Sequence, residues 1–341
     1  MRAVVCEALG SYRDLVIGER PMPTPGPGQV RIRAAYASVS FAITLMVGGS
    51  YQRKSTPPFV PGSEVAGVID AVADDVDEFA VGERVVAIVR EGGYADHVIA
   101  DTATIYKVPA ALALDDAVNV PLSYGTAYAG VITRAALQVG ETLLVHGAAG
   151  AIGMAAVQIG AMTGATVIAT ASTDAKCDAA REAGAAHTVN YAQGGFRDEV
   201  KRLTGGRGVD VVFDPVGGDV LNESLRAAAV EARIVVAGFA SGTIPQVPAN
   251  ILLVKNISLL GLNFSEYFGW GVHDRSVEFA PRLKQSMATL FEAVAAGQLR
   301  PTIGHRRPLE EIVAALDHLV ARRAIGKVVL AIDETLDEVR A

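Results

Sequence analysis

The sequence of 341 residues predicts an α/β protein in which a β-rich part is joined to a doubly wound parallel sheet. Two observations predict this fold. Short alternating or β-branched runs separated by turn residues fill the first part of the chain, as in antiparallel sheets. From about residue 123, apolar strand-like runs alternate with helix-like segments, which is typical of βαβ units. The runs of the first part span residues 30–37, 64–72, 84–89 and 94–99.

The second part opens with a helix-like segment over residues 126–137. Its apolar runs predict parallel strands at residues 143–145, 166–169, 209–213, 234–236 and 257–262. An amphipathic helix is expected around residues 282–296. After Gly297 we expect a loop, a helix over residues 309–322 and a closing strand over residues 327–332.

Composition excludes several classes of protein. Half of the residues are apolar, so a disordered chain or a coiled coil is not expected. A net charge of -7 has the wrong sign for a protein that binds nucleic acid by attraction to phosphates. Cys6 and Cys177 lie far apart and outside any CxxC spacing, which predicts neither a disulfide framework nor a cysteine-rich zinc site. With Glu7 interrupting the first apolar run, we expect a cytoplasmic protein without a signal peptide.

One stretch without charged residues, 142–173, is long enough to resemble a membrane span, which needs only about 20 apolar residues. Glycines divide it into a strand-like run, a turn, a helix and a second run. We therefore expect no membrane segment. The dividing residues are Gly147, Gly150, Gly153, Gly160 and Gly164.

The strongest motif is the glycine loop at residues 147–153, which follows the strand-like run 143–145 and leads into a helix. Its spacing, G-x-x-G-x-x-G, is a variant of the dinucleotide-binding fingerprint. Glycines let the backbone approach a pyrophosphate, and the amides and dipole at the helix start attract its charge. The alternative is a tight βα turn without a ligand.

The end of the second strand of this unit indicates which dinucleotide is bound. NAD-selective domains place an acidic residue there, whereas this strand is followed by Ser172, Thr173 and Lys176, which suit a 2′-phosphate. We therefore favour NADPH over NADH. The alternative is that Ser172 caps the helix beginning near Asp174 and that Lys176 is a solvated charge.

Further motifs occupy residues 49–51, 61–68, 92–95, 125–128, 146–153, 213–218 and 326–330. Taken together, they resemble one family over essentially the whole chain: the zinc-independent medium-chain dehydrogenase/reductases, and specifically the NADPH:quinone oxidoreductases that include zeta-crystallin. The resemblance implies a GroES-like domain from residues 1–121 and 266–341, an inserted Rossmann domain at 122–265, a cleft at their junction, and a homodimer formed through the strand at 257–262.

The same resemblance implies a set of cofactor-binding residues. Three of them, Ser172, Lys176 and Tyr191, would surround the adenosine phosphate. The pyrophosphate would contact Gly147, Ala148, Ala149, Gly150, Ala151, Ile152 and Gly153. The nicotinamide ribose and ring would lie between two further segments, Gly238, Phe239, Ala240 and Leu262, Asn263, Phe264. As alternatives, Gly238 ends a strand and Phe264 belongs to the core.

Zinc ligands are missing from the positions where zinc-dependent relatives carry them. The chain has Ser38-Val39-Ser40-Phe41 where a ligand cysteine begins that site, and Gly62-Ser63-Glu64 in place of Gly-His-Glu. No two of its six histidines form a recognisable ligand pair: His97, His146, His187, His273, His305 and His318. We therefore expect no metal.

Without a metal, hydride transfer requires hydrogen-bond donors at the oxygen that gains charge. Tyr51 is the first candidate for this donor or for a proton source, with Thr126 and Ser40 in support. Alternatively, Tyr51 is a core aromatic and Thr126 caps its helix. The family commonly has Asn and Asp where this chain has Ser40 and Ile43, which predicts a less polar substrate end.

Three functions follow from these observations. The first is NADPH-dependent reduction of quinones. The second is reduction of an activated carbon–carbon double bond, in an enone, an alkenal or an enoyl-CoA. The third is a protein that binds NADPH without catalysis.

Overall fold

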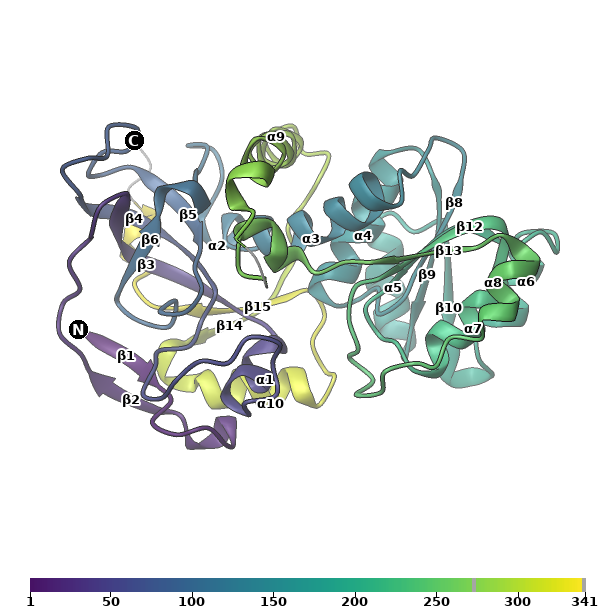
Figure 1. Ribbon diagram of the computed structural model, residues 1–341, viewed down its shortest axis with the longest axis horizontal. Helices are drawn as coiled ribbons and strands as arrows, with labels where there is room; N and C mark the ends of the chain where they lie inside the picture. The colour runs from purple at the N-terminus through teal and green to yellow at the C-terminus, as the bar shows by residue number, and fades with distance from the viewer. Residues whose placement is uncertain (272–273, 339–341) are drawn as a thin grey trace. The chain divides into compact units, whose positions relative to one another are not determined.

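The computed structural model describes residues 1–271 and 274–338. Its chain divides into two compact units. Unit 1 combines Met1–Leu122 with Ser265–Ala296 and Pro301–Ala341, and unit 2 consists of Ser123–Phe264 with Gly297–Arg300. In Figure 1 the purple start and the yellow end of the chain belong to the same unit, whereas unit 2 is teal and green. Unit 2 is therefore an insertion in unit 1. His273, one of the six histidines, lies outside the described residues.

Unit 2 contains a six-stranded parallel sheet in the order β10-β9-β8-β11-β12-β13. The order reverses beside β8, so the carboxyl end of β8 is the topological switch point, where such sheets bind ligands. All five strands predicted for this unit are present. The sequence pattern did not indicate β10, because this strand is short and half polar. The strands are β8 (Thr142–Val145), β9 (Thr166–Ala171), β10 (His187–Asn190), β11 (Val209–Asp214), β12 (Ala228–Val236) and β13 (Ser258–Gly261).

Helices cover both faces of this sheet (Figure 1). On one face, Leu144 and Ile168 share a buried cluster with residues of α6, α7 and α8. Their strand neighbours Leu143 and Val167 point to the other face, where a Cβ at Gly160 of α4 would lie 2.6 Å from Leu143. A glycine thus lets α4 approach the sheet closely. The helices are α3 (Gly125–Tyr128), α4 (Ala151–Met162), α5 (Asp174–Glu182), α6 (Arg197–Leu203), α7 (Asp219–Ala227) and α8 (Ala249–Lys255).

Unit 1 is built around a seven-stranded sheet in the order β14-β15-β3-β4-β5-β7, with β6 also paired to β3. Strands from both ends of the chain meet in it, because β15 pairs with β3. The remaining strands, β1 and β2, form a separate antiparallel pair. The strands are β1 (Arg2–Val5), β2 (Val16–Glu19), β3 (Gln29–Val39), β4 (Glu64–Val72), β5 (Arg84–Ile88), β6 (His97–Asp101), β7 (Ile105–Lys107), β14 (Ile303–Pro308) and β15 (Lys327–Ala331).

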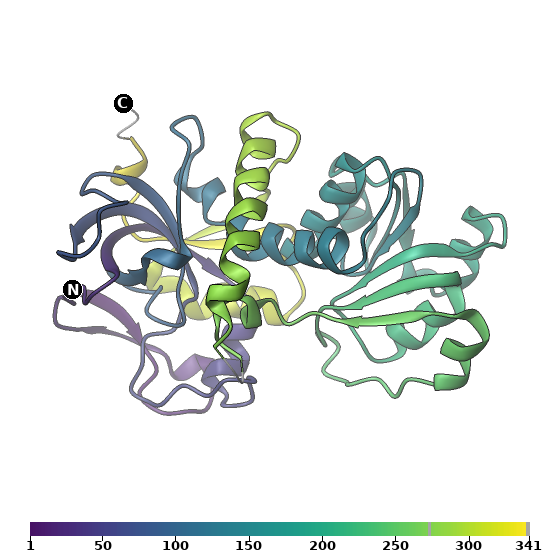
Figure 2. The same cartoon turned by 45° about the horizontal axis from the view of Figure 1, so that its top comes forward.

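Two predictions for unit 1 need correction. The segment expected as a loop after Gly297 contains β14, which pairs in parallel with β15. Three consecutive polar residues, 305–307, interrupt the alternation typical of a strand, so the sequence pattern did not indicate one. The helix expected from residue 282 begins earlier, as α9 (Ser276–Ala295), with Pro281 inside it. Figure 2 shows α9 along its length. The other helices are α1 (Ala42–Val47), α2 (Leu114–Ala117), α10 (Ile312–Val320) and α11 (Thr335–Glu338).

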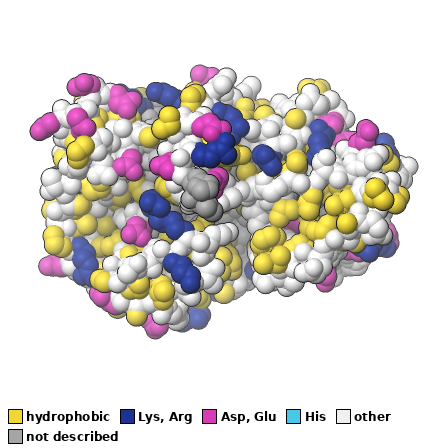
Figure 3. Space-filling view, in the orientation of Figure 1, with side chains coloured by type: hydrophobic (Ala, Val, Ile, Leu, Met, Phe, Trp, Pro, Cys, Tyr) yellow, Lys and Arg dark blue, Asp and Glu magenta, His cyan; other side chains and the backbone are white. Residues whose placement is uncertain are grey.

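The surface carries acidic and basic side chains interspersed among apolar ones on the face drawn in Figure 3. Both cysteines are free thiols with buried side chains. Within the described residues, no helix combines the length and the hydropathy that crossing a membrane requires.

Candidate cofactor and active site

The glycine loop follows β8 at the switch point and leads directly into α4. Gly147 has a φ of 59°, which a residue with a side chain rarely adopts. A Cβ at Gly153 would lie 2.2 Å from the carbonyl oxygen of Gly147. The loop conformation therefore requires glycine at both positions, whether or not a ligand binds.

Gly150 is different, because its own conformation does not require glycine. Its φ of -79° is ordinary, and a Cβ there would meet only the carbonyl oxygen of Gly147, at 3.4 Å. Gly150 is the N-cap of α4 and supplies no capping side chain. The amides of Ala151, Ile152 and Gly153 have no acceptor within the helix. The missing side chain thus leaves the positive end of a helix open to an anionic group.

A buried histidine lies directly before the glycine loop in the chain and is hydrogen-bonded on both sides of its ring. His146 is 1% exposed; its Nδ1 lies 2.8 Å from Thr170 Oγ1 and its Nε2 lies 2.8 Å from Ser224 Oγ. Because Ser224 donates its proton to the carbonyl of Val220, it accepts from Nε2–H, and Thr170 donates to Nδ1. Burial lowers the pKa of His146 to about 4. A neutral histidine therefore connects β8, β9 and α7.

The residues after β9 correct one interpretation of the sequence. Thr173, and not Ser172, caps α5: its hydroxyl accepts from the amide of Lys176 at 3.3 Å. Ser172 is half-buried, as is Lys176. The acidic residue nearest this strand end, Asp174, accepts a hydrogen bond from the side-chain amide of Asn190 at 2.7 Å. Its carboxylate is thus held by the segment after β10.

The other predicted cofactor residues follow neighbouring strands. Tyr191 directly follows β10 and is 39% exposed. Two segments, 238–240 and 262–264, follow β12 and β13. Since all these strands are parallel, these residues emerge at the same edge of the sheet as the glycine loop. Phe239 is 40% exposed, whereas Phe264 is buried, as the core alternative expected. Their contacts with a cofactor stay predictions.

Sequence reasoning missed a role for Asp214, at the carboxyl end of β11 beside the switch point. Its side chain is fully buried, and its Oδ1 accepts from the amides of Val216 and Gly217 at 2.7 and 3.0 Å. Its Oδ2 is buried without a hydrogen-bond partner among the described residues. Asp214 belongs to the motif at residues 213–218, which as a sequence pattern indicated the family and not this structural role. Asp214 fixes the turn against which the segment after β12 folds back.

In unit 1 the predicted substrate residues lie around α1. Ser40 precedes this helix and is half-buried, whereas Ile43 is 1% exposed and belongs to a buried cluster. The Tyr51 ring packs against that cluster, and its amide donates to the carbonyl of Leu45 at 3.1 Å. Burial raises the pKa of Tyr51, and the charge of Arg53 opposes this shift. Ile43 is thus a core residue.

Thr126 lies in unit 2, inside α3. The residue before this helix is Tyr124, so the interpretation of Thr126 as a cap is wrong. Helical turns of the π type at residues 120–124 and 129–134 flank α3, and together they replace the single helix expected at 126–137. Tyr124 is buried, with its hydroxyl 3.1 Å from Gln158 Oε1.

The positions where zinc-dependent relatives carry ligands contain a different arrangement. Ser38 donates its hydroxyl to Glu64 Oε2 at 2.6 Å, and Lys327 Nζ lies 3.1 Å from the same oxygen. The amide of Leu122 donates to Glu64 Oε1 at 2.7 Å. Across residues 1–271 and 274–338, no group of three or more His, Cys, Asp or Glu side chains is placed to hold a metal ion.

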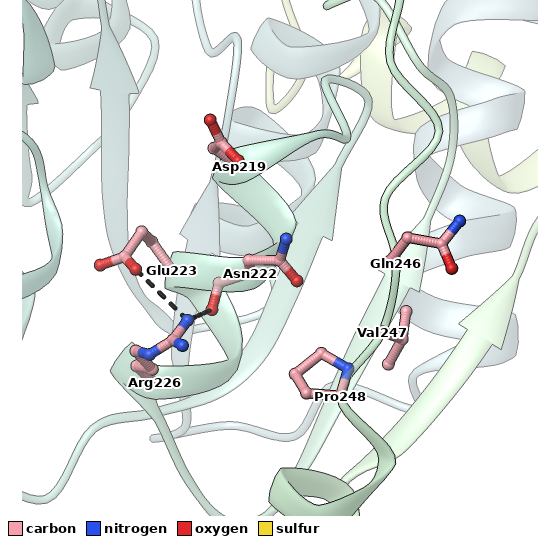
Figure 4. A pocket seen from close by; sticks show the side chains of 7 residues that line it. All are labelled: Asp219, Asn222, Glu223, Arg226, Gln246, Val247 and Pro248. Atoms are coloured by element: carbon pink, nitrogen blue, oxygen red, sulfur yellow. Dashed lines mark hydrogen bonds and ion pairs between the residues drawn. The ribbon is translucent and has the colours of Figure 1, made fainter.

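Unit 2 also carries an open surface hollow between α7 and the segment 246–248, shown in Figure 4. Arg226, one of the residues that line the hollow, donates to the carbonyl of Asn222 at 2.9 Å and to the side chain of Glu223 at 3.3 Å, both within the same helix. None of the predicted cofactor residues lines this hollow.

A doubly wound sheet with a glycine loop at its switch point, inserted in a mostly antiparallel β unit, defines a dehydrogenase of the two-domain nicotinamide type. Residues 26–110 match the family model of the alcohol dehydrogenase GroES-like domain, and residues 151–277 match that of the zinc-binding dehydrogenases. The chain is an oxidoreductase of the medium-chain dehydrogenase/reductase superfamily and belongs to its quinone oxidoreductase family. The predicted family and fold class are confirmed.

Three similar proteins illustrate this relationship. The quinone oxidoreductase-like protein 2 of Mus musculus is 41% identical over 332 residues, covering 97% of this chain and 92% of that protein. A 2-haloacrylate reductase of a Burkholderia species is 34% identical over 334 residues, covering 96% and 98%. The solved structure of a mycobacterial protein complexed with NADPH has a TM-score of 0.88 and 30% identity, covering 97% and 100%.

Proposed function

We propose that this oxidoreductase uses NADPH to reduce a small conjugated organic substrate. The observation that carries the proposal is the open helix N-terminus at Gly150, where the fold itself does not require a glycine. A pyrophosphate that contacts the amides of residues 151–153 explains why a side chain is missing there. The mycobacterial protein that shares the fold is complexed with NADPH.

The choice of NADPH over NADH rests on the residues after β9. The acid closest to the strand end, Asp174, is held by Asn190, so its carboxylate is engaged within the protein. Ser172 and Lys176 supply a hydroxyl and an ammonium group, both suited to a 2′-phosphate, with Tyr191 beside them. We assign these three residues to the adenosine phosphate. The segments 238–240 and 262–264 are assigned to the nicotinamide ribose and ring.

When bound, NADPH supplies a hydride from C4 of its nicotinamide. For a quinone substrate, we propose that Tyr51 donates a hydrogen bond to the oxygen that gains negative charge, with Ser40 and Thr126 as supporting hydroxyl groups. No described residue forms a hydrogen bond with the Tyr51 hydroxyl, so that donor is available. The raised pKa keeps this phenol protonated at neutral pH.

A second candidate reaction is reduction of an activated C=C bond, and the similarity to a 2-haloacrylate reductase favours it. The β-carbon accepts the hydride and the α-carbon accepts a proton. Two C–H bonds would replace the C=C π bond, and bound NADPH would supply the hydride as the two-electron reductant. The same donor at Tyr51 would stabilise the enolate oxygen.

We propose that neither reaction uses a metal. The carboxylate of Glu64 belongs to the Gly-Ser-Glu segment where relatives place zinc ligands, and it is already compensated by Lys327. Ser38, at the position where a ligand cysteine begins the site, donates to the same carboxylate. These groups satisfy one another and need no cation.

We also propose that the protein is a cytoplasmic homodimer whose subunits join along β13. This strand is the edge of the unit 2 sheet and pairs only with β12 among the described strands, so its outer backbone groups can bond a second copy. Apolar side chains lie exposed on β13 and on the preceding helix α8: Leu259, Leu253 and Val254. A reducing compartment agrees with the two free cysteines.

The test is a panel of quinones and enones, assayed for NADPH oxidation with purified full-length protein and analysed for products. Turnover with defined stoichiometry supports an enzyme, and the reduced product separates quinone from C=C reduction. Binding of NADPH without turnover of any substrate would establish the non-catalytic alternative. The active preparation is then assayed after exhaustive chelation, where loss of activity that zinc restores would overturn metal independence.

A further inference from the structure

Arg53 occupies an unusual environment in unit 1. It lies two residues after Tyr51 and is half-buried. Its guanidinium donates to the carbonyl oxygen of Arg90 at 2.8 Å, and its Cζ lies 6.0 Å from the centre of the Trp270 ring. An arginine near the face of an indole is held by cation–π attraction while its remaining N–H groups stay available. The contacts thus fix the position of Arg53 without using all its donors.

No ion pair with a described residue neutralises the charge of Arg53. Neither Arg53 nor Arg90 forms an ion pair with a carboxylate among the described residues, although the pKa of Asp274 is lowered by a side-chain hydrogen bond and further by the charge of Arg90. Burial and the neighbouring charge of Arg90 lower the pKa of Arg53, and Glu91 and Tyr51 oppose this shift. Two arginines held close together, one of them half-buried, repel each other. An added anion would relieve that repulsion and would regain the interactions lost to desolvation.

We propose that Arg53 binds the carboxylate of the substrate, and that this substrate is an α,β-unsaturated acid of the acrylate type. The inference rests on the proposed function, in which Tyr51 faces the reacting group. A guanidinium binds a carboxylate through two parallel N–H···O bonds in one plane. The Trp270 ring offers an apolar surface beside the guanidinium, which suits the flat carbon skeleton of a conjugated acid.

The geometry favours a small acid over a phosphorylated or nucleotide-linked substrate. One planar guanidinium matches one carboxylate, whereas a polyphosphate is typically bound by several cations or a row of backbone amides. Arg90 is exposed and adds a second positive charge that raises the local potential. The same alkene without the carboxylate, as in an ester, would lack the partner for Arg53. Acid and ester thus differ in the negative charge that Arg53 would bind, which is why the comparison uses KM for each and a matched control variant.

The experiment compares 2-chloroacrylate with its methyl ester in the full-length protein with saturating NADPH. We expect Arg53→Gln to raise KM for the acid about 10-fold or more, because a charged hydrogen bond is lost. KM for the ester should differ from the wild-type value by no more than about 2-fold, because the ester has no charged group for Arg53 to bind. Arg53→Lys should retain part of the affinity for the acid, since it keeps the charge but not the fork.

The matched control is Lys54→Gln, which removes one positive charge from the next residue, an exposed lysine. It should leave the acid-to-ester ratio of KM unchanged. Equal effects of Arg53→Gln on acid and ester, or an effect of Lys54→Gln as large, would overturn the proposal.

A binding measurement separates this inference from the proposed function. The saturated acid 2-chloropropionate is titrated into the protein by calorimetry, so that no turnover is needed. Binding that Arg53→Gln abolishes supports the anion site even if no substrate of the panel is reduced. Absence of binding to the wild-type protein overturns the anion site even if quinones are reduced.

Discussion

The ammonium group of Lys327 lies 3.1 Å from the carboxylate of Glu64, although 263 residues separate them in the chain. Both side chains are almost completely buried, with exposed fractions of 4% and 0%. Lys327 begins β15 and Glu64 begins β4, so the pair joins the C-terminal part of unit 1 to its N-terminal part. A buried charge that loses its partner is strongly unfavourable.

The first prediction concerns the stability of this pair. Lys327→Met should reduce the free energy of unfolding of unit 1 by about 3–5 kcal/mol, because Glu64 is left as an uncompensated buried charge. Urea denaturation followed by circular dichroism measures the change. The double variant Glu64→Gln with Lys327→Met should recover much of the loss. The control is Arg307→Gln, which breaks an exposed pair with Glu311 and should cost about 0.5 kcal/mol or less. Additive losses in the double variant would contradict the assignment.

The second prediction separates the roles of two glycines. Gly150→Val should keep the fold but abolish NADPH binding, because its side chain would stand at the open start of α4. Gly153→Ala should instead lower Tm, because its Cβ would collide with the carbonyl of Gly147. Calorimetric titration with NADPH and thermal unfolding distinguish the two. A folded Gly150→Val variant with unchanged NADPH affinity would refute the proposed phosphate site.

The third prediction concerns cofactor selectivity. Lys176→Ala should weaken NADPH binding about 10-fold or more, the loss expected for one charge-assisted hydrogen bond. NADH is the matched control, because it has no 2′-phosphate, and its dissociation constant should change little. Equal dissociation constants for the two cofactors in the wild-type protein would contradict the selectivity.

The fourth prediction concerns Tyr51. Tyr51→Phe keeps the ring in its place on the buried cluster but removes the hydroxyl, so kcat should fall about 10-fold or more, equivalent to about 1.4 kcal/mol. NADPH affinity should remain nearly constant. Because burial raises the pKa of Tyr51, its ionisation should not lower kcat near neutral pH. A variant with wild-type kcat and KM would remove Tyr51 from the mechanism.

The fifth prediction follows from the neutral state of His146. Its pKa is lowered to about 4 in the folded protein, whereas an unfolded histidine titrates near pH 6.5. The unfolded state therefore binds more protons between these values, and stability must fall as the pH decreases from about 6.5 to about 4. His146→Gln should flatten this part of the stability curve, measured as urea midpoints at several pH values. An unchanged pH dependence would show that folding does not lower the pKa of His146.

Local sequence was sufficient for the features that depend on neighbours in the chain. The strand, glycine turn and helix at 143–153 follow one another directly, so their residues and their order could be read together. The family and fold class followed from such local motifs. The sequence also indicated Tyr51, which lies directly after the turn that closes α1.

Features that join distant segments were decided by the tertiary structure. The cap of α5 is Thr173 and not Ser172, because only the backbone geometry determines which hydroxyl reaches the amide of Lys176. The strand β14 forms because β15 lies beside it. Arg53 reaches the Trp270 ring across more than 200 positions of sequence. Side-chain contacts of this kind depend on where the folded backbone brings two segments together, and residue periodicity contains no information on that distance.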